Sequence, residues 1–222
     1  MVDPLSPDRR RAIAEILRLQ SVPGLGRARA SRWVREGGDV AAALARASRE
    51  VAAPTLEVDA AGRAVDRLMA SCARSGVNVL LSTDTDYPTA LGRTADPPLM
   101  LYLRGRPIGA GERRVAVVGS RRASAYGRRV AEGLGRALAA SGVTVVSGLA
   151  LGIDGAAHAG ALAGPGRTVA VLATGLDRAY PRSHERLYQA LLERGAAYSE
   201  HPPGTPARRH HFPERNRLIA AP

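Results

Sequence analysis

The chain has 222 residues, with 32 basic and 20 acidic side chains, so its formal charge is 32 − 20 = +12 at pH 7. The sequence contains no lysine, so all of these basic residues are arginines. Its 45% hydrophobic and 23% charged residues exclude a disordered polycation, and its length allows one large domain or two small ones.

Residues 8–70 have the periodicity of a helical region. Apolar residues recur at helical spacing on both sides of a turn at 22–26, which contains two glycines. Asp39 is placed to cap a short third helix, and a further helix is expected over 63–75. The two helices around the turn resemble a helix-hairpin-helix or SAM-like module, whose turn amides can hold a DNA phosphate. A plain packing turn, with Trp33 in the core, is the alternative.

From residue 77 onward, short β-rich runs alternate with helical segments. Strands are expected at 77–81, 99–103, 115–118, 143–146, 168–173 and 196–199, and helices at 126–140, 153–163 and 185–194. This alternation predicts an α/β fold with a parallel sheet covered on both faces, in which the apolar run 115–118 is a buried strand. Ligands of such sheets bind beyond the carboxyl ends of the strands, so the loops that begin at Gly119, Ser147 and Thr174 are candidate sites.

The first of these loops has the features of a phosphate cradle. Gly119 lets a ligand approach the backbone, the Ser120 hydroxyl can donate to an anion, and a helix start follows. Arg121 and Arg122 add fork-shaped donors suited to phosphate. The loop has neither the dinucleotide-binding glycine pattern nor a P-loop, so no NAD or ATP is expected. The alternative is a structural loop, in which Ser124 only caps a helix.

The second loop adds a possible pair of titratable groups. Ser147 and Gly148 begin it and are expected to join the phosphate-binding surface. Asp154 and His158 stand four residues apart on one helix face, where an acid–base pair is conceivable. No nucleophile or metal-ligand set accompanies them, so we expect structural hydrogen bonds that support the loop, with no catalytic residue, metal or cofactor.

The third loop and the end of the chain are again basic. Arg178 and Arg182 place positive charge beside the candidate site, and Ser183 is a plausible N-cap for the next helix. The stretch 208–217 holds four arginines and two adjacent histidines, a poor zinc signature because no cysteine or carboxylate accompanies them at metal spacing. We interpret this stretch as a basic loop.

The positive charge has two interpretations. A polyanionic partner explains it, because clustered basic groups gain from releasing counterions at phosphates. Compositional drift in a GC-rich genome explains arginine in place of lysine but not the excess of basic over acidic residues. An aromatic content of 4% counts against repeated base-stacking platforms.

The sequence also indicates a compartment. Cys72 is the single cysteine, so no internal disulfide can form. We find no apolar run long enough for a membrane span and no secretory signal. The expected location is therefore the cytoplasm.

Several motifs occur in a characteristic order. They are Val117–Arg121, Ser147–Asp154 with Ala157-His158, Gly175–Asp177 with Tyr180-Pro181, Ser199-Glu200 and Phe212–Ala220, preceded by Asp86–Pro88 and Pro97–Tyr102 with Arg104-Gly105. In this order they closely resemble the DNA-processing protein DprA (Smf) family, from about residue 9 to the end of the chain.

The resemblance implies a helical SAM-like domain at 1–72 and an extended Rossmann-like domain at 73–222. It implies a non-enzymatic protein that binds single-stranded DNA, protects incoming strands and helps to load the recombinase RecA during natural transformation. The DNA-phosphate contacts carried over by motif are Gly119, Ser120, Arg121, Arg182, Arg215 and Arg217; Arg122 comes from the charge argument alone.

Family members continue beyond this motif with Gly-Leu-Ser, further strands and often a winged-helix domain, whereas this sequence ends at Pro222. The expectation is therefore a C-terminally incomplete sheet with an exposed apolar edge, and both homodimerisation and the RecA contact are open.

Two other functions are conceivable. The Rossmann-like core distantly resembles nucleotide phosphoribohydrolases, but their Pro-Gly-Gly-x-Gly-Thr loop is missing and Glu200 is the only acidic residue close to the expected ligand edge. Alternatively, residues 1–70 recruit a partner and the core is vestigial.

Overall fold

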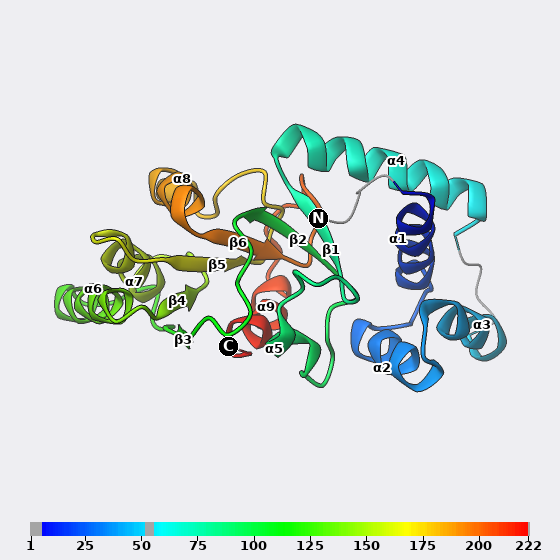
Figure 1. Ribbon diagram of the computed structural model, residues 1–222, viewed down its shortest axis with the longest axis horizontal. Helices are drawn as coiled ribbons and strands as arrows, with labels where there is room; N and C mark the ends of the chain where they lie inside the picture. Colours follow the sequence, from blue (N-terminus) through cyan, green and yellow to red (C-terminus); the bar gives the residue numbers. More distant parts are fainter. Residues whose placement is uncertain (1–5, 52–55, 222) are drawn as a thin grey trace.

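The computed structural model describes residues 6–51 and 56–221 (Figure 1). Four helices form the N-terminal region: α1 (Pro7–Gln20), α2 (Arg27–Gly37), α3 (Val40–Glu50) and α4 (Val58–Ser75). Asp39 caps α3 as expected, since its side chain accepts from the Ala42 amide at 2.7 Å. Trp33 is only 3% exposed and lies in the core. Helix α4 begins earlier than expected, and the anticipated domain boundary at 72/73 falls inside it.

The rest of the chain forms a six-stranded sheet in the order β1-β2-β6-β5-β4-β3. The strands are β1 (Asn78–Leu81), β2 (Met100–Gly105), β3 (Arg114–Ala116), β4 (Thr144–Ser147), β5 (Thr168–Leu172) and β6 (Ala196–Ser199). Strands β3 to β6 pair in parallel, but β2 runs antiparallel to both β1 and β6. The sheet is therefore mixed and not wholly parallel, because β1 and β2 are joined by a returning connection in place of a full βα crossover.

Helices cover both faces of this sheet. They are α5 (Thr89–Gly92), α6 (Ala125–Ala140), α7 (Ile153–Leu162), the 3₁₀ turn η1 (Arg182–His184), α8 (Glu185–Arg194) and α9 (His211–Ile219). Along β5, Ala170 and Leu172 belong to the core that includes α8, whereas Val169 and Val171 belong to the core that includes α9. This alternation follows from the two-residue period of a strand. Among the described residues, no helix has the length and apolar character needed to span a bilayer.

Two local expectations are wrong. The basic stretch 208–217 is largely helical, because α9 packs Leu218 and Ile219 against the sheet. Ser183 does not cap α8: it lies within η1, and the residue before the helix is His184.

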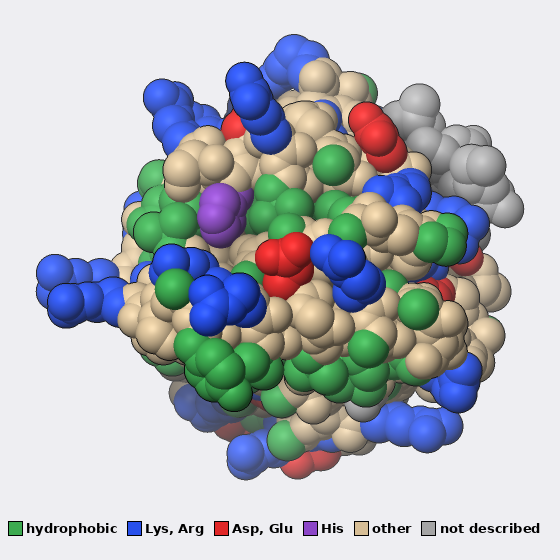
Figure 2. Space-filling model, turned by 90° about the vertical axis from the view of Figure 1, so that its left-hand side faces the viewer, with side chains coloured by type: hydrophobic (Ala, Val, Ile, Leu, Met, Phe, Trp, Pro, Cys, Tyr) green, Lys and Arg blue, Asp and Glu red, His purple; other side chains and the backbone are tan. Residues whose placement is uncertain are grey.

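The apolar run 115–118 is also not a buried strand. It forms β3 and its continuation at the edge of the sheet, where Val115 is 40% and Val118 60% exposed. Val130 and Leu134 of α6 are exposed as well. Figure 2, which faces this side of the molecule, shows hydrophobic side chains between arginines. The structure therefore places an edge with exposed apolar side chains at β3, while the expectation that strands are missing after Pro222 concerns a position outside the described residues.

Candidate nucleic-acid interface

The loop between β3 and α6 packs tightly on the start of α7 through two glycines. A Cβ on Gly119 would lie 2.6 Å from an Ile153 side-chain carbon. Gly152 has φ of 81°, and its Cβ would lie 2.1 Å from the Ser120 carbonyl oxygen. The Ile153 amide donates to that same carbonyl at 3.2 Å. Glycine at both positions therefore lets this loop and the start of α7 approach each other more closely than any side chain would allow.

Polar groups on this loop point to solvent beside a helix start. The Ser120 hydroxyl accepts from the Arg122 amide at 3.0 Å, which leaves its own proton available to an anion. Ser124 caps α6 by accepting from the Gly127 amide at 3.0 Å. Arg121 and Arg122 are exposed. The loop thus offers a hydroxyl and two guanidinium groups near the positive end of the α6 dipole.

Arg121 lies between two hollows. Its guanidinium carbon is 4.5 Å from the ring centre of Phe212, a cation–π geometry. Beneath it is a cavity of about 320 Å³ lined by Gly119, Phe212, Asn216 and neighbouring residues. On its other side an open groove of about 640 Å³ runs along α6; its lining includes Arg128, Arg129 and His184. Around the two hollows arginines outnumber carboxylates, which are Asp154 and Glu132, so the combined surface is basic and has room for an extended anion.

The third loop meets the same surface through an aromatic contact. The Tyr180 and Phe212 ring centres lie 5.6 Å apart, and Tyr180 is 42% exposed. Arg182, two residues further on, is exposed, whereas Arg178 pairs with Asp177 at 3.0 Å. Sequence reasoning missed Phe212 as a site residue, although it is the single phenylalanine of the chain and begins the last motif.

Ser147 and Gly148 do not fit the phosphate contacts expected of them. The Ser147 side chain is fully buried and its hydroxyl donates to the Val117 carbonyl at 2.5 Å. The Gly148 amide donates to Asp154 Oδ2 at 3.1 Å. Both groups therefore donate inside the protein, and these two residues are not part of the candidate interface.

Asp154 and His158 each make a structural contact, but not with each other. Asp154 holds the second loop through the Gly148 amide. His158 lies deeper, with its Nδ1 2.6 Å from Thr168 Oγ1 on β5. Burial lowers the pKa of His158 to about 3, so the imidazole is neutral at pH 7. A neutral, fully buried imidazole cannot exchange protons with a bound ligand at the surface.

Arg215 is a buried support and not an exposed phosphate ligand. Only 5% of it is exposed, and its Nη1 donates to the Gly148 carbonyl at 2.9 Å and to the Val171 carbonyl. Burial lowers the pKa of Arg215 to about 10, which leaves it charged at pH 7. His211, expected in a loop, is also buried and begins α9. The end of the chain therefore ties the second loop to the sheet.

Arg217 lies apart from this surface. Its Nε is 3.1 Å from Asp96 Oδ2, and its Nη2 donates to Glu200 Oε1 at 2.5 Å. Both carboxylates are mostly buried. Of the arginines predicted to contact phosphate, the structure leaves Arg121, Arg122 and Arg182 exposed and holds Arg215 and Arg217 in internal contacts.

Comparison with known proteins identifies the relatives of this chain. The family model described as DNA recombination-mediator protein A matches residues 78–222. The chain belongs to this family, which includes proteins named DprA and Smf. Protein Smf of Synechocystis is 42% identical over 146 residues, which cover 64% of this chain and 36% of the relative. DprA of Bacillus subtilis is 34% identical over 155 residues, covering 69% of this chain and 52% of the relative.

Two solved structures extend the DprA comparison to the fold. DprA from Streptococcus pneumoniae superposes with a TM-score of 0.73 and 31% identity, covering 94% of this chain and 74% of that one. DprA from Helicobacter pylori, whose structure is described for its single-stranded DNA binding mode, has a TM-score of 0.56 and 30% identity, with 65% of each chain covered. The chain has the DprA fold and spans about a third to a half of the curated relatives it matches.

Proposed function

We propose that this protein binds single-stranded DNA through its phosphates at the loop after β3. The contacts in this proposal are Gly119, Ser120, Arg121, Arg122 and Arg182. The observation that carries it is the exposed Ser120–Arg122 segment, with Arg121 placed between a cavity and a basic groove. Family membership supports DNA as the polyanion, because the relatives are named as DNA-processing proteins.

The chemistry of the site favours contacts that do not depend on sequence. Guanidinium and hydroxyl groups recognise phosphate oxygens, which every nucleotide presents. Aromatic side chains are scarce in the chain, and Phe212 is half-buried between Arg121 and Tyr180. Phosphate contacts therefore supply most of the affinity, which makes binding strongly dependent on salt.

The test is the salt dependence of binding in the Arg121→Ala variant. Fluorescence anisotropy with a labelled oligo-dT gives the affinity across a series of salt concentrations. Loss of one phosphate contact lowers the slope of log K against log salt by about 0.7 for a single strand. Arg74→Ala, which removes an exposed charge from the last turn of α4, is the control. Equal affinities and slopes for Arg121→Ala and wild type would refute the proposal.

We extend the proposal to transfer of the bound strand to the recombinase RecA, as the family description of a recombination mediator suggests. RecA filament assembly on coated single strands, with and without this protein, tests that step separately from binding. The homodimer that the family resemblance implies is tested by sedimentation of the protein.

A phosphoribohydrolase activity is disfavoured because Glu200 is engaged in ion pairs with Arg27 and Arg217.

A further inference from the structure

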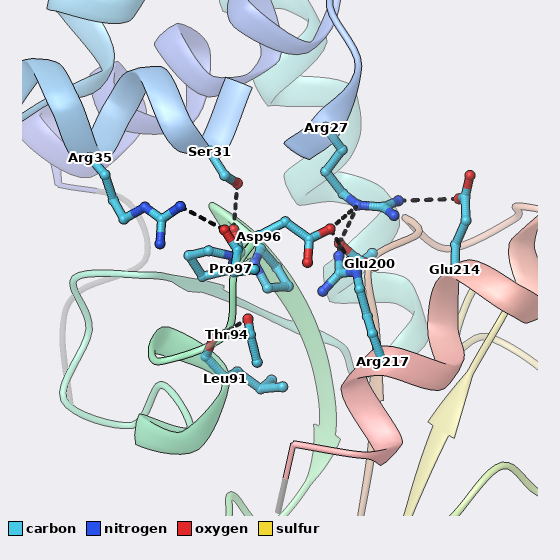
Figure 3. A network of polar contacts seen from close by, with 12 residues as sticks. Arg27, Ser31, Arg35, Leu91, Thr94, Asp96, Pro97, Glu200, Glu214 and Arg217 are labelled. Atoms are coloured by element: carbon cyan, nitrogen blue, oxygen red, sulfur yellow. Dashed lines mark hydrogen bonds and ion pairs between the residues drawn. The ribbon is translucent and has the colours of Figure 1, made fainter. Parts of the chain in front are cut away.

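Five charged side chains meet where α2, the loop before β2, the end of β6 and α9 come together (Figure 3). This charged network consists of Arg27, Asp96, Glu200, Glu214 and Arg217. Arg217 bridges Asp96 and Glu200, as described above. Arg27 Nη1 lies 3.1 Å from Glu214 Oε2, and its Nε lies 3.4 Å from Glu200 Oε1. Four separate segments of the chain are joined in this way.

The network is partly withdrawn from water. The exposed fractions are 10% for the Glu200 side chain, 20% for Arg217 and 22% for Asp96. Burial raises the pKa of Glu200, while the charges of Arg217 and Arg27 oppose that rise. Removal of Arg217 therefore leaves the carboxylates of Asp96 and Glu200 close together, with too little solvent to separate their charges.

Helix α2 also donates hydrogen bonds to main-chain carbonyls of the loop before β2 (Figure 3). Ser31 Oγ donates to the Pro97 carbonyl at 2.6 Å, and Arg35 Nη2 donates to the Ala95 carbonyl at 2.6 Å. Ser31 is 1% exposed. The N-terminal helices are thus fixed to the loop before β2, against which Arg217 of α9 is held in turn.

Helix α9 connects the charged network to the candidate interface, because it has residues in both. Phe212 at its start lies under Arg121, and Arg215 holds the Gly148 carbonyl. Arg217 follows Arg215 by two residues on the same short helix. A shift of α9 at Arg217 therefore moves both the ring beneath Arg121 and the support of the second loop.

We propose that Arg217 and Arg27 are positioning residues for DNA binding: they act by holding α9 in place and do not contact phosphate. This inference rests on the proposed function and departs from the contact that family resemblance assigns to Arg217. It also gives the N-terminal helices a role at the site, because Arg27 comes from α2.

The first experiment compares Arg217→Ala with wild type by oligo-dT anisotropy across salt concentrations. A positioning role predicts an affinity weaker by roughly 2- to 30-fold at every salt concentration. The slope stays unchanged, because the phosphate contacts keep their number and only their geometry worsens. A direct contact predicts a slope lower by about 0.7. That lower slope, or an affinity equal to wild type, would overturn the inference; Arg74→Ala controls for the loss of one positive charge.

A second variant separates the two roles by the sign of the effect. Glu200→Gln removes a negative charge and frees Arg217, so a direct phosphate contact predicts tighter binding. Positioning predicts weaker binding, because the network loses its most buried carboxylate. Tighter binding would overturn the inference even if Arg217→Ala failed to fold.

Hydrogen exchange tests the same idea without DNA. Amides of residues 211–219 should exchange faster in Arg217→Ala than in wild type and should be unaffected by Arg74→Ala. Unchanged exchange would overturn the inference. A wild-type protein that binds no oligonucleotide would instead refute the proposed function and the role of the network in it, so the two failures are distinguishable.

Discussion

Lowering the pH from 7 to 5 should destabilise the fold through one buried histidine, His158 of α7. The Thr168 hydroxyl donates to the Val145 carbonyl at 2.8 Å, so its lone pair accepts the Nδ1 proton of His158. Its Nε2 is buried and contacts no hydrogen-bond acceptor among the described residues, so this nitrogen is unprotonated and the imidazole is neutral. Burial, together with the charges of His184 and Arg215, lowers the pKa of His158 to about 3.

The size of the effect follows from proton linkage. In the unfolded chain this imidazole titrates near 6.5, above its folded pKa, so the unfolded state gains a proton first as the pH falls. Stability is full above the unfolded value and is lost progressively toward the folded value. The loss is about 0.2 kcal/mol at pH 7 and about 2 kcal/mol at pH 5.

The assay is urea unfolding followed by circular dichroism at several pH values. His158→Asn keeps a donor close to the position of Nδ1 but cannot become charged. Between pH 7 and pH 5, the free energy of unfolding should fall by about 2 kcal/mol more in wild type than in this variant. His210→Asn, at an exposed position, is the control. The same pH dependence in His158→Asn and wild type would show that the folded histidine titrates normally and would refute the reasoning.

Three further outcomes follow from buried contacts. A Cβ on Gly148 would lie 2.2 Å from Arg215 Nη1, so Gly148→Ala should destabilise the protein by about 1–3 kcal/mol in urea unfolding. Ser31→Ala removes the donor to the Pro97 carbonyl and should cost about 1–3 kcal/mol, seen as a lower midpoint of thermal unfolding. Burial raises the pKa of the Cys72 thiol to about 11, so a disulfide reagent at pH 8 should label it only after unfolding; rapid labelling of the folded protein would contradict this.

The sequence predicts the strands well but not their positions in the sheet. The runs at 115–118 and 168–173 look alike, since both are short and apolar. In the structure, β5 lies between β4 and β6, whereas β3 lies at an edge with Val115 and Val118 exposed. Strand pairing decides which run is covered, and pairing depends on residues far apart in the chain.

One part of the candidate site could be predicted from the sequence and another could not. The Gly119–Arg122 loop could be predicted because its features are local: glycine, hydroxyl and guanidinium groups before a helix start. Helix α9 could not, because its sequence is mostly polar and it is held by packing and by Arg215. The acceptors of Arg215 are main-chain carbonyls of Gly148 and Val171, and no sequence motif marks a carbonyl as free to accept.

The net positive charge suggests a polyanionic partner, but the sequence does not show which arginines would bind it. Arginine has five donors, which suit phosphate and buried carbonyls or carboxylates equally. Arg9 shows the second use, since it is 8% exposed and donates to both oxygens of Asp84 and to the Val79 carbonyl. Arg121 is suited to the first use, phosphate binding, because it is exposed and lies at the edge of a cavity. The 32 arginines behind the charge of +12 therefore fall into two populations, which only their exposure and the acceptors already in contact with them distinguish.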